Sequence, residues 1–134
     1  MSPFKKGAGA FELAAHLDLH QFKSTVTGRA KIGVVAFADA LLVIPKVLAQ
    51  NSGFDAQATL IELLEECQNQ THSEVQHPYI GLDVETGKPM LADKAGILDC
   101  YRVKKQLLHL GSLIAIKLLL VDEVMRAGRK MGPK

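Results

Sequence analysis

The 134-residue sequence has little excess charge of either sign and only two cysteines. A formal net charge of +2 gives no case for a nucleic-acid partner, because nucleic-acid-binding domains carry strong basic patches. Cys67 and Cys100 lie far apart and lack the spacing of metal ligands. This cysteine usage indicates reduced thiols in a cytoplasmic compartment. We see neither an internal repeat nor a low-complexity segment.

The sequence also lacks a secretory signal and a convincing membrane span. The opening MSPFKKGAGAFEL contains no apolar core of a signal peptide. The most apolar run, Leu107–Val121, includes His109 and Lys117 and is shorter than the roughly 20 residues that a bilayer requires. We therefore expect a buried helix there. The composition, 48% hydrophobic and 22% charged, is that of one globular domain with a real core.

The segment Gly28–Asp55 organises the chain. Its apolar residues recur every three to four positions and predict a helix over Arg29–Gln50 that is apolar on most sides. We expect this helix to lie in the middle of the domain. Pro45 removes one helical hydrogen bond, which predicts a kink near Leu41–Pro45. Gly53 predicts the end of the helix.

Further helices are predicted on both sides of this segment. The glycine turn Gly7–Ala10 leads into FELAAHLDLHQF, a short helix from about Gly9. Asp55 is placed to cap AQATLIELLEECQNQ, and Asp99 is placed to cap a long helix from about Tyr101 to Met125. We expect the central helix to pack against this terminal helix.

A single β-hairpin is predicted between these helices. Tyr79–Val84 and Lys88–Leu91 flank Glu85-Thr86-Gly87, and Pro89 confines its strand to a sheet edge. The predicted fold class is therefore mainly α, a helical bundle with one small β-hairpin.

Three local features leave their function open. A glycine turn before a helix presents N–H groups to an anion, or simply allows a tight turn. His72 and His77 lie in the polar segment Asn69–Pro78 without a framework of other ligands, so we predict no metal site. The basic end of the chain motivates a nucleic-acid reading, but no aromatic platform accompanies it; its cations are Arg126, Arg129, Lys130 and Lys134.

Three collinear segments resemble one family. They are GAGAFE, then GRAKIGVVAFADALLVIPKVLAQNSGFD, then GLDVETGKPMLADKAGILDCYRVKKQLLHLGSLIAIKLLLVDEVMRAG. Together they cover nearly all of Gly7–Gly128 and resemble the C-terminal part of a subunit of the eukaryotic cytosolic chaperonin, also called TRiC or CCT. Met1–Lys6 departs from the family, which has an apolar run ending in proline there, and the Asn69–Pro78 loop looks longer and more polar.

The resemblance implies the C-terminal half of an equatorial domain, which is mostly helical, binds ATP and makes most ring contacts. A full subunit is several times longer, so we expect a fragment: residues 1–6 a disordered leader, 7–128 the half-domain, and 129–134 a flexible basic tail. The implied parent is an ATP-dependent chaperonin that assists the folding of cytosolic proteins in the cytoplasm. Its implied partners are other chaperonin subunits in a hetero-oligomeric double ring and unfolded client proteins, with no nucleic acid and no membrane.

The resemblance also implies a nucleotide site. A glycine turn matching Gly7, Ala8 and Gly9 would lie against the ribose and base, and a hairpin segment matching Gly81, Leu82 and Asp83 would border the adenine. An acidic residue matching Asp99 would accept hydrogen bonds from the ribose hydroxyls, and a lysine matching Lys104 would lie near the nucleotide. Cys100 stands where the family often has proline. For Asp99, a plain helix cap is the alternative role.

Two parts of the family's ATPase apparatus are absent from these 134 residues. They are the glycine-aspartate-threonine phosphate loop and the catalytic aspartate of the intermediate domain. The implied cofactor is therefore ATP or ADP, with Mg²⁺ held elsewhere in a full-length subunit, and this chain supplies neither a catalytic residue nor a metal ligand. We expect no hydrolysis by the chain alone, and self-association through Leu107–Val121 or Ile32–Leu48. The alternative is a non-enzymatic helical interaction module that binds no nucleotide.

Overall fold

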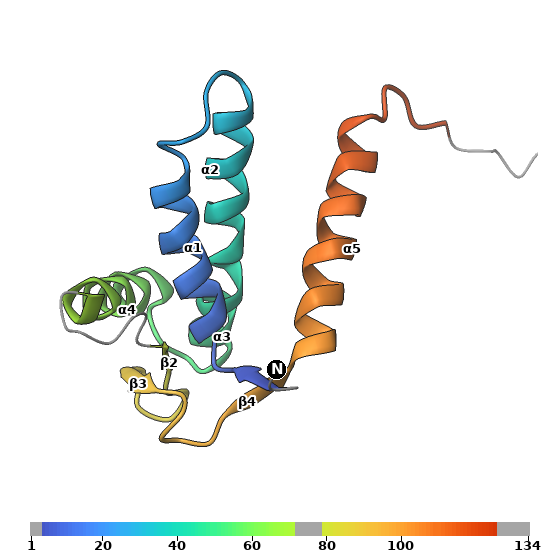
Figure 1. Ribbon diagram of the computed structural model, residues 1–134. Coiled ribbons are helices and arrows are strands. Elements are labelled where there is room, and N and C mark those ends of the chain that lie inside the picture. The colour runs from blue at the N-terminus through green and yellow to red at the C-terminus, as the bar shows by residue number, and fades with distance from the viewer. Residues whose placement is uncertain (1–3, 72–78, 126–134) are drawn as a thin grey trace, which may run out of the picture. The chain divides into compact units, whose positions relative to one another are not determined.

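The computed structural model describes residues 4–71 and 79–125, and it divides the chain at Cys100 into two units. Figure 1 shows the mainly helical fold that the sequence predicts. The first unit contains β1 (Phe4–Lys6), α1 (Ala10–Phe22), α2 (Ala30–Leu41), α3 (Val43–Asn51), α4 (Ala56–Thr71), β2 (Ile80–Leu82), β3 (Pro89–Leu91) and β4 (Leu98–Cys100). The second unit contains α5 (Tyr101–Leu119).

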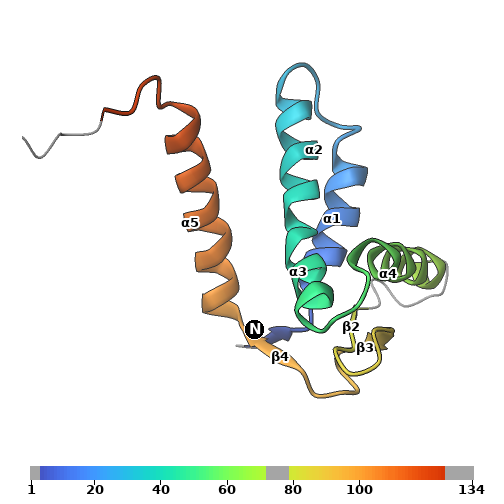
Figure 2. The same cartoon turned by 180° about the vertical axis from the view of Figure 1, so that it is seen from behind.

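Two views show how the helices of the first unit are arranged. In Figures 1 and 2, α1 and α2 lie side by side as an antiparallel pair, and α3 continues the direction of α2. The helix α4 packs against α3 and runs crosswise to this pair. The lower ends of α1 and α3 therefore meet α4 and the short strands.

The predicted kink is confirmed as a break between α2 and α3. Pro45 has no N–H for the carbonyl of Leu41, and α2 ends at that residue. The Leu42 N–H donates instead to the Asp39 carbonyl at 3.2 Å, and helical bonding resumes with Lys46 N–H to the Leu42 carbonyl at 3.1 Å. The predicted stop is also confirmed, because α3 ends at Asn51 and Gly53 has a φ of +83°.

Within the first unit, the expected central position of this helix is wrong. Ile32 is 71% exposed and Val43 is 53% exposed, whereas Ala38 and Ala49 are buried. Within the first unit only one face of α2 and α3 is covered, since α1 packs on one side and α4 on the lower end. Apolar periodicity identifies faces that can be buried, but it does not say which neighbours cover them.

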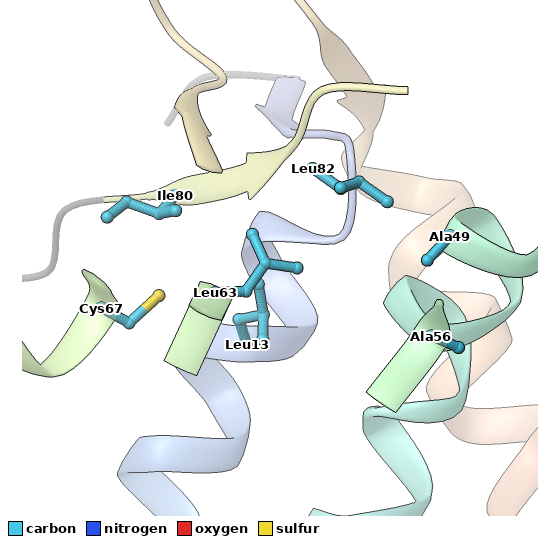
Figure 3. Packing of buried hydrophobic residues seen from close by; sticks show 7 residues of the cluster. All are labelled: Leu13, Ala49, Ala56, Leu63, Cys67, Ile80 and Leu82. Atoms are coloured by element: carbon cyan, nitrogen blue, oxygen red, sulfur yellow. The ribbon is translucent and has the colours of Figure 1, made fainter. Parts of the chain in front are cut away.

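The core of the first unit lies where α1, α3, α4 and β2 meet. Figure 3 shows the cluster from close by; its buried members are Leu13, Ala49, Ala56, Leu63, Cys67, Ile80 and Leu82. Ile80 and Leu82 are two residues apart on β2 and therefore face the same side of the strand. This core holds the start of α1 directly beneath the hairpin.

Both small sheets are antiparallel pairs of strands. The predicted hairpin is confirmed: β2 pairs with β3, with Ile80 opposite Leu91 and Leu82 opposite Pro89. The pairing of β1 with β4 was not predicted, and it places Lys5 opposite Asp99. The expectation of a disordered leader is thus wrong for Phe4–Lys6, which gain backbone partners from β4. Met1–Pro3, the tail 129–134, and His72 and His77 lie outside the described residues.

The two predicted helix caps have different outcomes. The Asp55 cap is confirmed, because its Oδ1 accepts hydrogen bonds from the N–H groups of Gln57 (2.8 Å) and Ala58 (3.0 Å). These bonds hold the pKa of the Asp55 carboxyl below its usual value. Asp99 lies within β4 and Cys100 directly precedes α5, so Asp99 lies one residue before the position expected for the cap. The helix α5 also ends at Leu119, short of the predicted Met125.

One helical stretch of the described residues, Ala30–Asn51, is long and apolar enough to cross a membrane by length and composition, with a mean hydropathy of 2.1. The stretch corresponds to α2 and α3, which are interrupted at Leu42. A single stretch of this kind is weak evidence, since core helices of soluble proteins pass the same test.

Candidate functional site: a glycine turn under a hairpin

The turn Gly7–Gly9 connects β1 to α1. The Ala10 N–H donates to the Gly7 carbonyl at 3.0 Å, and the Leu13 N–H donates to the Gly9 carbonyl at 3.1 Å as the helix begins. Ala8 and Gly9 have φ values of +56° and +77°. A positive φ is uncommon for alanine, so the surrounding contacts must hold Ala8 in this conformation.

The strand β2 lies directly against this turn. The Leu82 N–H donates to the Ala8 carbonyl at 2.9 Å. A Cβ atom on Gly81 would lie 2.8 Å from both the Cβ and the carbonyl oxygen of Ala8. Real Cβ atoms do not come so close to backbone, so this approach requires glycine at position 81.

The strand β4 closes the other side of the turn. The Gly7 N–H donates to the Ile97 carbonyl at 2.9 Å. A Cβ atom on Gly7 would lie 3.0 Å from Cγ2 of Ile97 and 3.3 Å from Oδ1 of Asp99. The carboxyl group of Asp99 is therefore adjacent to the glycine turn, although the two are more than 90 residues apart in the sequence.

Pro45 supports the turn from the core side, a contact that the sequence reasoning missed. A Cβ atom on Gly9 would lie 3.1 Å from Cβ of Pro45. The bend between α2 and α3 thus brings the proline ring under the start of α1. A proline inside a helical pattern signals a bend, but the partner of that bend depends on the tertiary fold.

Asp83 and Lys104 complete the set of predicted site residues. The Asp83 carboxylate accepts hydrogen bonds from the Glu85 N–H (2.9 Å) and the Thr86 hydroxyl (2.8 Å), which lower the pKa of this carboxyl. Its side chain therefore serves the hairpin turn. Lys104 lies in the first turn of α5 in the second unit and is buried.

The structure thus places three of the other predicted residues, Gly81, Leu82 and Asp99, against the turn formed by Gly7, Ala8 and Gly9. Asp83 directly follows Leu82 in the sequence, and Lys104 belongs to the second unit. The arrangement is a close-packed wall of small residues with one carboxyl group beside it. Such a wall can receive a flat ligand and accept hydrogen bonds from it, and within the described residues it contains no nucleophile.

A second polar cluster lies away from this wall and was not predicted. His16 and His20 on α1 face Asp39 on α2, and one ligand atom from each lies within 4.8 Å of the others. The sequence signal was available, since His16 and His20 are four residues apart and so share one face of a helix. The predicted absence of a metal site rests on His72, His77 and the two cysteines, and it leaves His16 and His20 out.

Comparison with known proteins places the chain in a family. The family description that matches, over residues 3–129, is the TCP-1/cpn60 chaperonin family, and the chain belongs to this family. T-complex protein 1 subunit zeta-2 of Homo sapiens and its counterpart in Mus musculus are each 53% identical to it over 122 residues. The match covers 91% of this chain and 22% of each relative, so the chain spans about a fifth of their length.

A solved structure shows the same fold. A group II chaperonin from Methanococcoides burtonii, described as an open-state monomer, superposes with a TM-score of 0.77 at 28% sequence identity. The match covers 88% of this chain and 28% of that one. The resemblance noted from the sequence is thereby confirmed at the level of family and fold. The segments GAGA, NSGFD and VDEVMRAG, which together look most like a zeta subunit, agree with these relatives.

Proposed function

We propose that this chain forms one wall of the nucleotide site of a chaperonin subunit. In this proposal the Gly7–Gly9 turn and Gly81-Leu82 lie against the base and ribose of ATP or ADP, and Asp99 accepts hydrogen bonds from the ribose hydroxyls. Asp83 acts by shaping the hairpin, and the proposed role of Lys104, which belongs to the second unit, rests on the family resemblance alone. The observation that carries the proposal is the contact of Gly7 with Asp99 and of Ala8 with Gly81.

The residues present fit part of a nucleotide. A base or ribose needs a surface without protruding side chains, and positions 7, 8, 9 and 81 hold only glycine and alanine. Bound nucleotide would supply the phosphoanhydride whose hydrolysis drives the parent protein. Mg²⁺ and the phosphates would be held by residues outside this chain.

The proposed role of the parent is assistance in protein folding. It would act in the cytoplasm, with other chaperonin subunits in a hetero-oligomeric double ring and with unfolded proteins as clients. Family membership supports this assignment, since the relatives are subunits of T-complex protein 1 and a group II chaperonin. The alternative is a helical interaction module that binds no nucleotide, and it predicts that the Gly7–Gly9 turn and Gly81-Leu82 do not respond to added nucleotide.

Titration of the ¹⁵N-labelled chain with ADP tests the proposal. We expect amide chemical shifts to move at Gly7, Ala8 and Leu82, and we expect Asp99→Ala to abolish these shifts while the chain stays folded. Asp122→Ala is the control, because Asp122 is exposed and lies far along the chain in the second unit. A folded chain whose wall amides do not respond to millimolar ADP would favour the interaction module.

A further inference from the structure

We propose that His16, His20 and Asp39 form a site for a transition-metal ion, best matched by Zn²⁺, that joins α1 to α2. The proposal is independent of the nucleotide wall, since it uses different residues and a different ligand. Its geometry is a pair of imidazoles on one helix opposed by a carboxylate on the neighbouring helix. Two histidines and one carboxylate are a common protein ligand set for zinc.

The spacing of the two histidines is the first reason. Residues four apart lie one above the other on the same helical face. The rings of His16 and His20 are accordingly in contact, with centroids 4.3 Å apart. This places two nitrogen donors on the surface that α1 turns toward α2.

The position of Asp39 is the second reason. Its Oδ1 lies 3.3 Å from Nε2 of His20 and 3.9 Å from Nδ1 of His16. Ligands about 2.0–2.2 Å from a zinc ion are separated from one another by distances close to these. The three donors thus need only small side-chain adjustments to surround one ion.

The three side chains of the cluster become more exposed from the interior toward the solvent. The side chain of His16 is 10% exposed, that of His20 is 30% exposed and that of Asp39 is 59% exposed. The inner ligand is therefore held by packing, and the outer side leaves room for water to complete the coordination. This pattern is that of a site with three protein ligands and an open position.

The present hydrogen bonds show what an ion would replace. His16 Nδ1 lies 2.9 Å from the Ala38 carbonyl, to which it donates. For Nδ1 of His16 to bind an ion, its proton must move to Nε2 and the hydrogen bond to the Ala38 carbonyl is lost. Lys23 Nζ donates to His20 Nδ1 at 2.9 Å, which leaves the His20 proton on Nε2, toward Asp39. Metal binding through Nε2 moves this proton to Nδ1 and expels the Lys23 ammonium. Lys23 is thus a built-in competitor of the ion.

The test uses the full chain with His72, His77 and His109 replaced by Gln, so that His16 and His20 are the only histidines. Urea unfolding is measured with ZnCl₂ and with EDTA. At a free Zn²⁺ concentration of 100 times Kd, we expect the ratio of folded to unfolded chain to rise about 100-fold. Co²⁺ in place of Zn²⁺ should give visible absorption bands of a bound ion.

Three variants at exposed or half-exposed positions decide the outcome. His20→Gln keeps an N–H for Asp39 but removes the imidazole, and Asp39→Asn removes the carboxylate charge. Each should weaken Zn²⁺ binding at least about tenfold. Lys23→Met should strengthen it, because the competing ammonium is gone, and Glu62→Gln on α4 should leave it unchanged.

The result that overturns the proposal is equally direct. If Zn²⁺ at millimolar concentration does not shift the urea midpoint of the parent background, the cluster is only a hydrogen-bonded contact between two helices. If the shift persists undiminished in both His20→Gln and Asp39→Asn, the ion binds elsewhere. Both variants keep His16 and the core intact, so a failure to fold would not obscure the answer.

Discussion

Ala8 and Gly81 are in direct backbone contact, with so little space between them that a Cβ on Gly81 would lie 2.8 Å from the Ala8 carbonyl oxygen. The neighbouring Leu82 N–H donates to that same carbonyl at 2.9 Å. A hydrogen bond to the Ala8 carbonyl therefore fixes the hairpin on the turn before α1. This contact joins the two halves of the proposed nucleotide wall.

Gly81→Ala should consequently destabilise the chain by about 1–3 kcal/mol, the usual effect of forcing an extra carbon into a filled site. Urea unfolding followed by circular dichroism measures the change. Gly33→Ala is the matched control, because nothing lies within 4 Å of a Cβ there and Gly33 is inside α2. It should stabilise the chain by about 0.5–1 kcal/mol. Equal effects at the two positions would contradict the contact.

The core of the first unit gives a second prediction. Leu63 is fully buried in the cluster of Figure 3, whereas Ile61, on the same helix, is 56% exposed. Leu63→Asp should cost at least about 3 kcal/mol, because it places an unpaired charge in the core. Ile61→Asp should change stability by no more than about 0.5 kcal/mol. A Leu63→Asp chain with an unchanged urea midpoint would refute the assigned core.

The local parts of this fold were predictable from local sequence. The Asp55 cap, the break before Pro45, the stop at Gly53 and the hairpin each depend on residues within a few positions of one another. Backbone sterics and short-range hydrogen bonds decide such features. The mainly α class followed from the same patterns.

Features that join distant segments were not predictable in the same way. The β1–β4 pairing places Asp99 in a strand whose partner lies more than 90 residues away in the sequence. The contact of Gly9 with Pro45 likewise depends on how α1 meets α3. The family resemblance supplied the identities of the residues in the nucleotide wall, but only the tertiary structure shows that Gly7 lies beside Asp99. Only the tertiary structure, likewise, shows that His16, His20 and Asp39 lie together.

The buried thiol of Cys67 gives a third prediction, which concerns pH. Burial, and secondarily the charge of Glu66, raises the pKa of Cys67 to about 11 from a usual value of 9.0. Because the folded pKa is the higher one, the contribution of this thiol to stability is complete below pH 9 and is lost as pH rises through 11. The Cys100→Ser variant isolates Cys67 for measurement.

The difference in absorbance near 240 nm between that variant and a chain with both cysteines replaced by Ser follows the titration of Cys67, because the subtraction removes the absorbance of Tyr79 and Tyr101. We expect a midpoint near 11 in the folded chain and near 9.0 in urea. Ellman's reagent should accordingly modify Cys67 slowly in the folded chain, while Cys100 in Cys67→Ser reacts quickly because it is exposed. Identical titration midpoints in the folded and unfolded chain would show that Cys67 is accessible to water.

The exposed apolar face of α2 and α3 gives the last prediction, self-association. Ile32, Val43 and Val47 are 71%, 53% and 42% exposed, and Phe37 is 38% exposed. Taken by itself, α5 also carries apolar residues along its length, including Leu107, Leu110 and Ile114. Contiguous apolar surface of this kind is uncommon on a monomer and favours association.

Sedimentation velocity at several concentrations measures this tendency. We expect the average mass to rise above the 14.5 kDa of one chain as concentration increases. Ile32→Lys should shift the distribution toward the monomer, since it places a charge on the α2–α3 face. Ile61→Lys, a similarly exposed change on α4, should have a smaller effect, because Ile61 lies outside that face. A strictly monomeric mass at the highest concentration would mean that the exposed apolar residues of α2 and α3 do not hold two chains together.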